Sequence, residues 1–359
     1  MVSFSELHVA YKKCKKNKAN TINAIKFEIH LGDNLWRLFE EINSFTYEPS
    51  SYICFIVQSP KMREVFASNF RDRVVHHLLV GDLEKVFEPI FIYDSYSCRV
   101  GKGTHKAVDR VQFFSRKKDN TYYMQLDIKN FFLSIDKNIL FRRIKEILLK
   151  RDCQNMQRAL YLAEKTIFDN PASKFRFKGD FSKHKNIPKH KTLLYTPQER
   201  GLPIGNLTSQ FFANVYLDIM DNYIKRVLKV KYYVRYVDDF ILFGKTKENL
   251  LLKKSQIEKF IASHLKLSLR DNFRVAKVEE GVDFLGYVIR PYYKLVRNRV
   301  VNNFKYKKAV FLQNSFRDDG TCSKKLAKEF KQVNASYYGH FKHANSYRLI
   351  QKYDMEKWL

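Results

Sequence analysis

The sequence predicts an α+β fold in which several lobes share one chain. Segments with apolar residues at helical spacing alternate irregularly with short apolar, β-branched or aromatic runs bounded by turn residues. The chain has 359 residues, of which 45% are hydrophobic, so it can bury a sizeable core and form two or three domain-sized units. It contains neither an internal repeat nor a low-complexity linker, and we therefore expect the lobes to be interleaved.

The N-terminal part predicts helices, then a hairpin, then another helix. The basic stretch up to Lys18 favours a helix, and helical spacing recurs over residues 25–42 and 70–87. Between these helices, residues 52–57 and 64–67 are typical of two strands separated by Ser59-Pro60-Lys61. We expect a hairpin with basic residues at its tip.

The rest of the chain predicts a mixture of strands and helices. The pattern indicates strands over residues 121–128, 232–236 and 240–243, and helices over 137–150, about 154–168 and from near residue 209. Residues 175–191 are rich in Lys and His and are expected to form a loop-like basic connector. From Pro291 onward the sequence favours helices and is basic, which suits an appended lobe that grips a nucleic-acid backbone.

The charge of the chain points to a polyanionic partner. Lys and Arg number 66 against 37 Asp and Glu, which leaves a formal net charge of +29. The five cysteines show no paired spacing, so neither a zinc cage nor a disulfide framework is expected. No apolar run is long enough to cross a membrane and no signal peptide is evident, so we expect a soluble protein in a reducing, intracellular compartment.

The strongest chemical signal is Tyr236-Val237-Asp238-Asp239, in which two adjacent acids lie at a turn between apolar strands. Burying carboxylates is costly unless a cation compensates their charge. Asp127 also ends an apolar strand, and strand ends of one sheet can bring distant acids together. Three such carboxylates could hold two Mg²⁺ ions about 4 Å apart for phosphoryl transfer. The alternative is that they are turn residues or helix caps.

A series of motifs in this order resembles the motif blocks of reverse transcriptases over roughly residues 50–290. The motifs are Lys61-Met62-Arg63, Arg99 with Gly101-Lys102-Gly103-Thr104-His105, the stretch from Asp127 to Asp136, the stretch from Gly201 to Gln210, the stretch from Tyr236 to Asp239, and Phe284-Leu285-Gly286. Among these enzymes the chain is most similar to the bacterial and phage group that includes group II intron, retron and diversity-generating retroelement enzymes.

The resemblance implies a right-hand polymerase fold with fingers, palm and thumb. Fingers and palm would occupy residues 1–290, with the palm core at about 116–137 and 196–290, and residues 291–359 would form a short, basic helical thumb. The implied activity is RNA-directed DNA synthesis with two Mg²⁺ ions, a template RNA, an RNA/cDNA duplex and dNTPs. Asp127, Asp238 and Asp239 would be catalytic, and the same acids with Ile128 would form the metal site.

Further roles follow from the same resemblance. The residues implied in dNTP binding are Lys61, Arg63, Phe132, Ile204 and Gly205, and those implied in template or primer binding are Arg99, Asn206, Gln210, Tyr236, Phe284, Leu285 and Gly286. Phe132 would crowd the sugar 2′ position and so select dNTPs over rNTPs. The alternatives stay open: Phe131 and Phe132 can both be core aromatics, the cations can be ordinary solvated surface, and Phe284-Leu285-Gly286 can be an ordinary strand turn.

Two departures from the common motif narrow the resemblance. This chain has Ile204 and Gln210 where most relatives carry Gln and Pro, a form similar to the diversity-generating retroelement branch. Enzymes of that branch misincorporate opposite template adenine, and an isoleucine offers only shape where a polar amide could hydrogen-bond. The branch also implies a small, basic, ring-forming accessory variability protein and a bacterial or phage-encoded enzyme that acts in the host cytoplasm.

Other classes of function remain as alternatives. Retron-like, group II intron-like and defence-associated reverse transcriptases share most of the motifs. A non-catalytic RNA-binding protein would explain the charge and the 15% aromatic content, but not acids framed by apolar strands. A metal-dependent nuclease would explain the acids, but not Phe132 or the stretch from Leu202 to Gln210.

Overall fold

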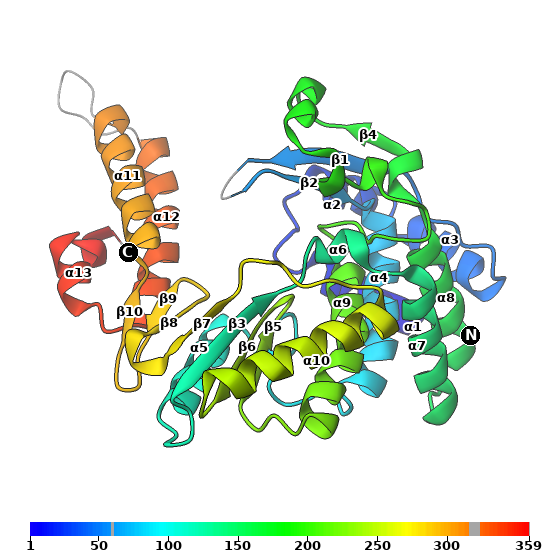
Figure 1. The fold of residues 1–359 in the computed structure, drawn as a ribbon. Helices are drawn as coiled ribbons and strands as arrows, with labels where there is room; N and C mark the ends of the chain where they lie inside the picture. The colour runs from blue at the N-terminus through cyan, green and yellow to red at the C-terminus, as the bar shows by residue number, and fades with distance from the viewer. Residues whose placement is uncertain (59–60, 316–323, 359) are drawn as a thin grey trace. The chain divides into compact units, whose positions relative to one another are not determined.

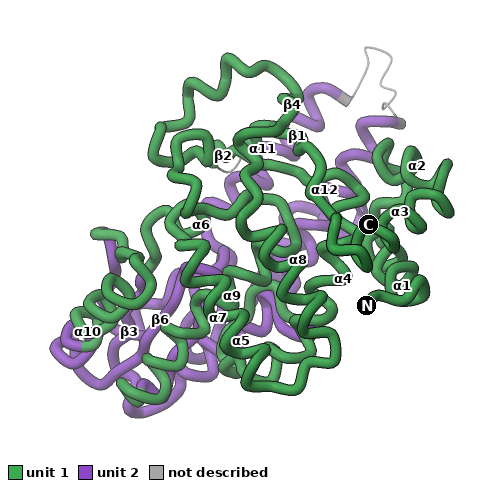
Figure 2. The backbone as a smooth tube through the Cα atoms, turned by 90° about the vertical axis from the view of Figure 1, so that its right-hand side faces the viewer, with its two compact units in different colours: residues 1–99, 127–229, 253–271 green, residues 100–126, 230–252, 272–359 purple. Residues whose placement is uncertain are grey.

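The computed structural model describes residues 1–58, 61–315 and 324–358. Helices and strands follow one another in an irregular order (Figure 1), and the expected α+β class is confirmed. The chain forms two compact units, and each draws on three separate segments (Figure 2). Unit 1 comprises residues 1–99, 127–229 and 253–271, and unit 2 comprises residues 100–126, 230–252 and 272–359.

Unit 1 begins with three helices, α1 (Phe4–Lys15), α2 (Ile22–Ile29) and α3 (Leu31–Asn43). α1 starts at a capping box, in which the Ser3 hydroxyl and the Glu6 carboxylate each accept a hydrogen bond from the other residue's backbone N–H. The periodic stretch over residues 25–42 forms two helices rather than one. The reason is that His30, with φ −121° and ψ 47°, leaves helical geometry between them.

The sheet of unit 1 contains β1 (Tyr52–Val57), β2 (Arg63–Ala67) and β4 (Phe175–Phe177) in the order β2-β1-β4. β1 and β2 form the predicted antiparallel hairpin, and the predicted break at Ser59 and Pro60 lies outside the described residues. β4 pairs in parallel with β1. Residues 175–191 are therefore not wholly loop-like, because they begin with an edge strand that is too short for a periodic signal.

The helical body of unit 1 is formed around α4 (Phe70–Phe87), which packs against α1, α8 (Met156–Phe168) and α9 (Leu207–Asn222). α7 (Lys137–Lys150) packs on α8 and α9, and the short α6 (Phe131–Ser134) follows Asn130. The predicted helices over 70–87 and 137–150 are confirmed. The helix expected from near Ser209 begins two residues earlier, at Leu207, and continues into a π-helical turn over Tyr223–Val227.

The main sheet of unit 2 has the order β5-β6-β3-β7. Its strands are β5 (Tyr233–Tyr236), β6 (Asp239–Gly244), β3 (Tyr122–Asp127) and β7 (Arg274–Lys277). The three strands predicted over residues 121–128, 232–236 and 240–243 are confirmed to within one or two residues. α5 (Thr104–Ser115) packs against β5, and α10 (Lys247–Leu265) runs from unit 2 into unit 1; neither helix was expected from the sequence pattern.

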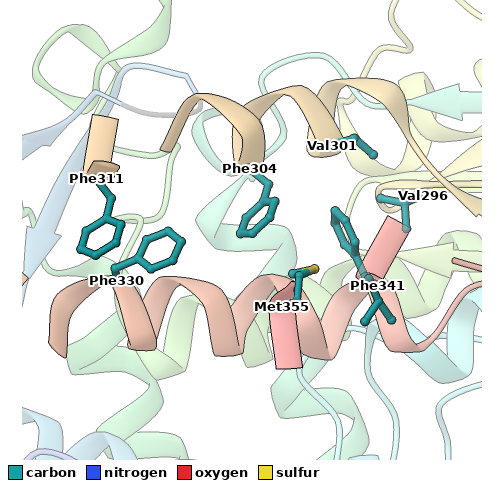
Figure 3. Packing of buried hydrophobic residues seen from close by; sticks show 8 residues of the cluster. Val296, Val301, Phe304, Phe311, Phe330, Phe341 and Met355 are labelled. Carbon is teal, nitrogen blue, oxygen red and sulfur yellow. The ribbon is translucent and has the colours of Figure 1, made fainter. Parts of the chain in front are cut away.

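The C-terminal part of unit 2 joins a small sheet to a helical lobe. β8 (Val282–Phe284), β9 (Tyr287–Ile289) and β10 (Lys294–Val296) form the sheet in the order β10-β9-β8. They precede α11 (Asn298–Ser315), α12 (Lys324–Lys342) and α13 (Tyr347–Lys352), as the helical tendency after Pro291 predicts. Phe304 is fully buried between α11 and α12, and Phe311 stacks on Phe330 with ring centroids 4.2 Å apart (Figure 3). No helix among the described residues is long and apolar enough to span a membrane.

Candidate active site

The acids of the Tyr236–Asp239 motif lie at a tight two-residue turn. β5 ends at Tyr236, β6 begins at Asp239, and these two residues face each other across the hairpin. Val237 has a φ of +57°, a conformation that is costly for a β-branched residue. The fully buried Arg235 stabilises it, because its Nη1 donates a 3.0 Å hydrogen bond to the Val237 carbonyl. The protein thus holds this turn in one strained shape.

Asp239 is a partly buried acid that, among the described residues, accepts side-chain hydrogen bonds from one residue. The side-chain amide of Gln125 donates to its two carboxylate oxygens at 3.1 and 3.2 Å. Burial raises the pKa of Asp239 to about 6; the Gln125 hydrogen bonds and the Arg297 charge oppose the rise, and the neighbouring Asp238 adds to it. A site that makes a carboxylate hard to ionise, next to a second carboxylate, favours a bound cation.

Asp127 is the last residue of β3, which is the neighbour of β6 in the sheet of unit 2. Gln125 precedes it by two residues, so the side chains of Gln125 and Asp127 extend from the same face of β3. Within unit 1, the Nε of Arg270 lies 3.0 Å from Oδ2 of Asp127, and the Arg270 backbone N–H donates to the Asp127 carbonyl at 2.8 Å. Ile128, the next residue, is fully buried and forms a bridge with Leu269.

The carboxylate oxygens of this site suit a divalent cation whose coordination is completed by substrate phosphates. Among the described residues, no three His, Cys, Asp or Glu side chains gather closely enough to hold a metal by themselves. Mg²⁺ in nucleotide-handling sites is commonly held by one or two carboxylates together with substrate phosphates. Adjacent Asp238 and Asp239 supply oxygen ligands of that kind, so the absence of a complete protein cage is compatible with such an ion.

Several residues predicted to bind dNTPs lie near one another in unit 1. The Phe66 backbone N–H in β2 donates to the Ile204 carbonyl at 3.1 Å, and Ser68 donates to the Asn206 side chain from its backbone N–H (3.2 Å) and its hydroxyl (2.8 Å). Gly205 has a φ of +115°, and a Cβ added there would lie 2.7 Å from Cγ1 of Val65. This position therefore requires glycine, because both the backbone conformation and the space exclude a side chain.

Phe132 is joined to the same loop through its backbone. Its carbonyl accepts a 2.8 Å hydrogen bond from the Leu202 N–H, two residues before Ile204. The two neighbouring aromatics differ in exposure, since Phe131 is 2% exposed and belongs to the core whereas Phe132 is only partly buried. Lys61 and Arg63 are exposed at the described end of the β1–β2 hairpin. The dNTP-binding roles of these residues stay predictions.

The residues predicted to contact template or primer are less uniform. Arg99 is held inside unit 1: its guanidinium pairs with Glu88, with 2.8 Å between Nη2 and Oε2, and donates to the Ile92 carbonyl at 2.7 Å. Asn206 is buried, and exposed Gln210 accepts a 3.4 Å hydrogen bond from the Cys98 thiol. A nucleic-acid contact by Arg99 or Asn206 would require rearrangement, and these roles stay predictions.

The remaining predicted contacts lie in unit 2. The Tyr236 hydroxyl forms a 3.1 Å hydrogen bond with the Thr104 hydroxyl at the start of α5. Phe284 is fully buried, while Leu285 (φ +50°) and Gly286 (φ +90°) form the two-residue turn between β8 and β9. The His340 ring of α12 lies 3.0 Å from the position of a Cβ added to Gly286, so this turn is packed against the C-terminal helices.

Two residues of the candidate site, Gln125 and Arg270, were not expected from the sequence. Gln125 could have been found, because it precedes Asp127 by two residues on a strand and must share its face. No local pattern identifies Arg270 as the partner of Asp127, since the pair joins residues from distant segments of the chain.

A family comparison covers most of the region that contains these residues. The sequence model described as "Reverse transcriptase (RNA-dependent DNA polymerase)" matches residues 58–289. The matched range begins just after β1 and includes β2, the Gly205 loop and the acids of both β3 and β6. It ends at the last residue of β9.

Curated relatives are distant and generally longer than this chain. An "Uncharacterized 91 kDa protein in cob intron" of Schizosaccharomyces pombe is 26% identical over 228 residues, covering 61% of this chain and 24% of that protein. The "Group II intron-encoded protein LtrA" of Lactococcus lactis is 24% identical over 354 residues, covering 79% of this chain and 54% of that protein. "Protein YkfC" of Escherichia coli is 22% identical, with 80% of each protein covered. The chain thus spans about a quarter and about half of the length of the first two.

One solved structure also aligns with most of the chain. It is a telomerase from Candida albicans in complex with a fragment of telomeric RNA, with 12% sequence identity, a TM-score of 0.44 and coverage of 90% of this chain and 64% of that one.

Proposed function

Because this chain belongs to the reverse transcriptase family, we propose that it is an RNA-directed DNA polymerase that copies a template RNA into cDNA. One observation supports the proposal above all others: adjacent Asp238 and Asp239 lie at a strained turn of an apolar hairpin, and β6 of that hairpin pairs with the strand that ends in Asp127. A right-hand polymerase fold accompanies membership of this family.

We propose that Asp127, Asp238 and Asp239 are the catalytic acids and hold Mg²⁺. Bound Mg²⁺ would neutralise the charge of the dNTP phosphates and of the primer 3′ oxygen. Gln125 orients the Asp239 carboxylate through its hydrogen bonds. Arg270 forms an ion pair with Asp127 in the absence of substrate. Lys61 and Arg63 offer exposed cations for the triphosphate, while Phe132 limits the space at the sugar 2′ carbon.

Primer extension on an RNA template with Mg²⁺ and dNTPs tests the proposal. The wild-type chain should extend the primer, and Asp238→Ala should lose at least a thousandfold in rate, because one of the metal-binding carboxylates is gone. Asp271→Ala is a matched control, since it removes an exposed acid next to Arg270 without touching the hairpin. If neither protein extends the primer, a non-catalytic RNA-binding protein is the better explanation. If Asp238→Ala is as active as the wild type, Asp238 is not a catalytic acid.

The subtype is a separate proposal. Ile204 and Gln210 support an error-prone enzyme of the diversity-generating retroelement type, whereas the similarity to a group II intron-encoded protein supports a group II-like enzyme. Sequencing cDNA made by Ile204→Gln discriminates between them. For the error-prone type, errors opposite template adenine should fall several-fold in the variant while errors opposite other bases stay the same. An unaltered adenine error spectrum would favour the group II-like type.

Partners and location follow from the subtype. The diversity-generating type is expected to work with a small, basic, ring-forming accessory variability protein and in the cytoplasm of a bacterial host. Purification of the chain with and without the neighbouring gene product, followed by cDNA synthesis on the cognate RNA, tests the partner. Full activity of the chain alone would argue against a required accessory protein.

A further inference from the structure

A strongly basic segment lies at the edge of the sheet of unit 1. We define the basic edge segment as residues 174–191, which begin with β4 and contain seven Lys or Arg residues against one acid, Asp180. The Asp180 carboxylate accepts a 2.9 Å hydrogen bond from the Ser182 N–H and so caps its own turn. Six cations of the segment are exposed: Arg176, Lys178, Lys183, Lys185, Lys189 and Lys191. Within the described part of the chain, none of these six forms an ion pair with an acid.

The segment is anchored by backbone and side-chain contacts along its length. At its start, the Tyr52 N–H donates to the Lys174 carbonyl (2.9 Å) and the Lys178 N–H donates to the Cys54 carbonyl (2.8 Å), so β4 extends the sheet next to β1 (Figure 1). Its apolar side chains pack beneath the sheet, where Phe175 meets the buried Phe66 edge-on at 5.5 Å. The apolar side chains of the segment therefore pack in the core, whereas its cations are exposed to solvent.

A buried polar group holds the middle of the segment. His184 lies in the 3-10 helical turn Phe181–Asn186, and its Nε2 is 2.6 Å from Oε2 of Glu64 in β2. The same carboxylate accepts hydrogen bonds from the Thr192 hydroxyl (2.6 Å) and the Leu193 N–H (2.9 Å), and Glu64, His184 and Thr192 are all buried. A buried carboxylate with three partners is well satisfied, so the segment is ordered before any ligand binds.

Exposed aromatic rings accompany the cations. Phe181 is 51% exposed and lies parallel to the His184 ring, with centroids 5.4 Å apart and 6° between the planes. Tyr195, just beyond the segment, is 61% exposed, and the Lys189 ammonium lies 5.4 Å from the centre of its ring. Cations that follow a phosphate backbone and rings on which bases stack are the two features shared by proteins that bind single-stranded nucleic acid.

We propose that the basic edge segment, together with Tyr195, is a binding surface for single-stranded RNA. This inference rests on the proposed function in one respect: we name RNA rather than DNA as the ligand. The reason is that an RNA-directed DNA polymerase binds a single-stranded RNA template. Cations alone would also suit an acidic protein or a duplex, but neither uses exposed rings as stacking platforms. The anchored His184 and Glu64 position the surface without contacting the ligand.

Binding of the full chain to a labelled, unstructured RNA of about twelve nucleotides tests the charged part of the surface. The triple variant K183A/K185A/K189A should bind at least tenfold more weakly at moderate salt. The slope of log K against log[salt] should fall by about 2, since each phosphate contact on a single strand contributes about 0.7. The matched control K145A/K150A/K259A removes three exposed lysines of α7 and α10 and should change binding less than threefold. Equal losses in both triple variants would overturn the proposal, because they would indicate general attraction to a basic protein.

The aromatic part is tested by F181A and Y195A. Each should weaken binding of single-stranded RNA about tenfold and leave binding of blunt RNA duplex nearly unchanged, because paired bases cannot stack on the rings. Unchanged single-strand affinity in both variants, or equal losses for strand and duplex, would overturn the proposal. Thermal unfolding of each variant at the wild-type temperature shows that the fold is intact.

These measurements need neither dNTPs nor Mg²⁺, so they are independent of catalysis. If the wild type binds single-stranded RNA through this surface but does not extend primers, the proposed function fails and the surface stands. If primers are extended and the segment variants bind RNA as the wild type does, the surface fails and the proposed function stands.

Discussion

The side-chain amide of Gln125 donates to both carboxylate oxygens of Asp239 and thereby links β3 to the first residue of β6. Hydrogen bonds to the ionised form of an acid lower its pKa, so Gln125→Ala should raise the pKa of Asp239 above its value of about 6. The acidic limb of the activity profile should move up by as much as about one pH unit. Activity near pH 6.5 should fall about three- to tenfold, while activity at pH 8.5 stays near the wild-type value.

Primer extension between pH 6 and pH 9 at a fixed, subsaturating Mg²⁺ concentration checks this expectation, because protonation of Asp239 then competes with metal binding. Gln112→Ala is the matched control, because Gln112 also lies in unit 2 but donates to the Arg290 carbonyl. Superimposable pH profiles for Gln125→Ala and the wild type would show that the hydrogen bonds do not tune Asp239.

Asp239 should destabilise the metal-free protein at neutral pH. Its pKa rises from 3.8 to about 6 on folding, so the unfavourable effect is absent below about pH 4, grows as pH rises and is complete above about pH 6. Asp239→Asn should therefore increase the free energy of unfolding at pH 8 by up to about 3 kcal/mol and change it little at pH 4. Urea unfolding at both pH values measures the difference. A stability gain of equal size at pH 4 and pH 8 would be inconsistent with titration of this group.

Phe131 and Phe132 should respond differently to truncation although they are adjacent. Phe131→Ala empties a core position and should cost about 3–5 kcal/mol of unfolding free energy. Phe132→Ala should cost less and should admit rNTPs, because the partly buried ring no longer limits the space at the sugar. Competition between dNTP and rNTP in primer extension, with urea unfolding of both variants, measures the two effects. An unchanged preference for dNTPs in Phe132→Ala would show that its ring is not the selecting group.

Gly205 should be sensitive to the smallest substitution. In Gly205→Ala the new methyl group would meet Val65 Cγ1 at 2.7 Å and the backbone would keep a φ of +115°, so we expect a loss of about 1–3 kcal/mol and a higher KM for dNTPs. Gly101→Ala is the control: its φ is +71°, but nothing lies within 4 Å of the added methyl group. It should lose only about 1 kcal/mol, from backbone strain. Equal destabilisation of the two variants would show that contact with Val65 is unimportant.

Local pattern predicted the elements near the candidate site better than the contacts within it. Alternation and apolar content identified β3, β5 and β6, because a strand's side chains repeat every two residues whatever lies beside it. The helices α5 and α10 were missed, since α5 follows a glycine-rich bend and α10 is rich in lysine without a clean apolar stripe. β4 was missed because three residues are too few for a period to show.

By itself the sequence determined the fold class, the positive charge, the ordered motifs of the family and the apolar setting of Asp127, Asp238 and Asp239. Tertiary structure alone decided that Gln125 serves Asp239, that Arg270 pairs with Asp127, and that Glu64 holds His184 across 120 residues of chain. The physical reason is the separation in sequence over which each interaction acts. Backbone torsions and side-chain alternation act between neighbours in sequence, whereas these partners meet only when separately formed strands and helices pack together.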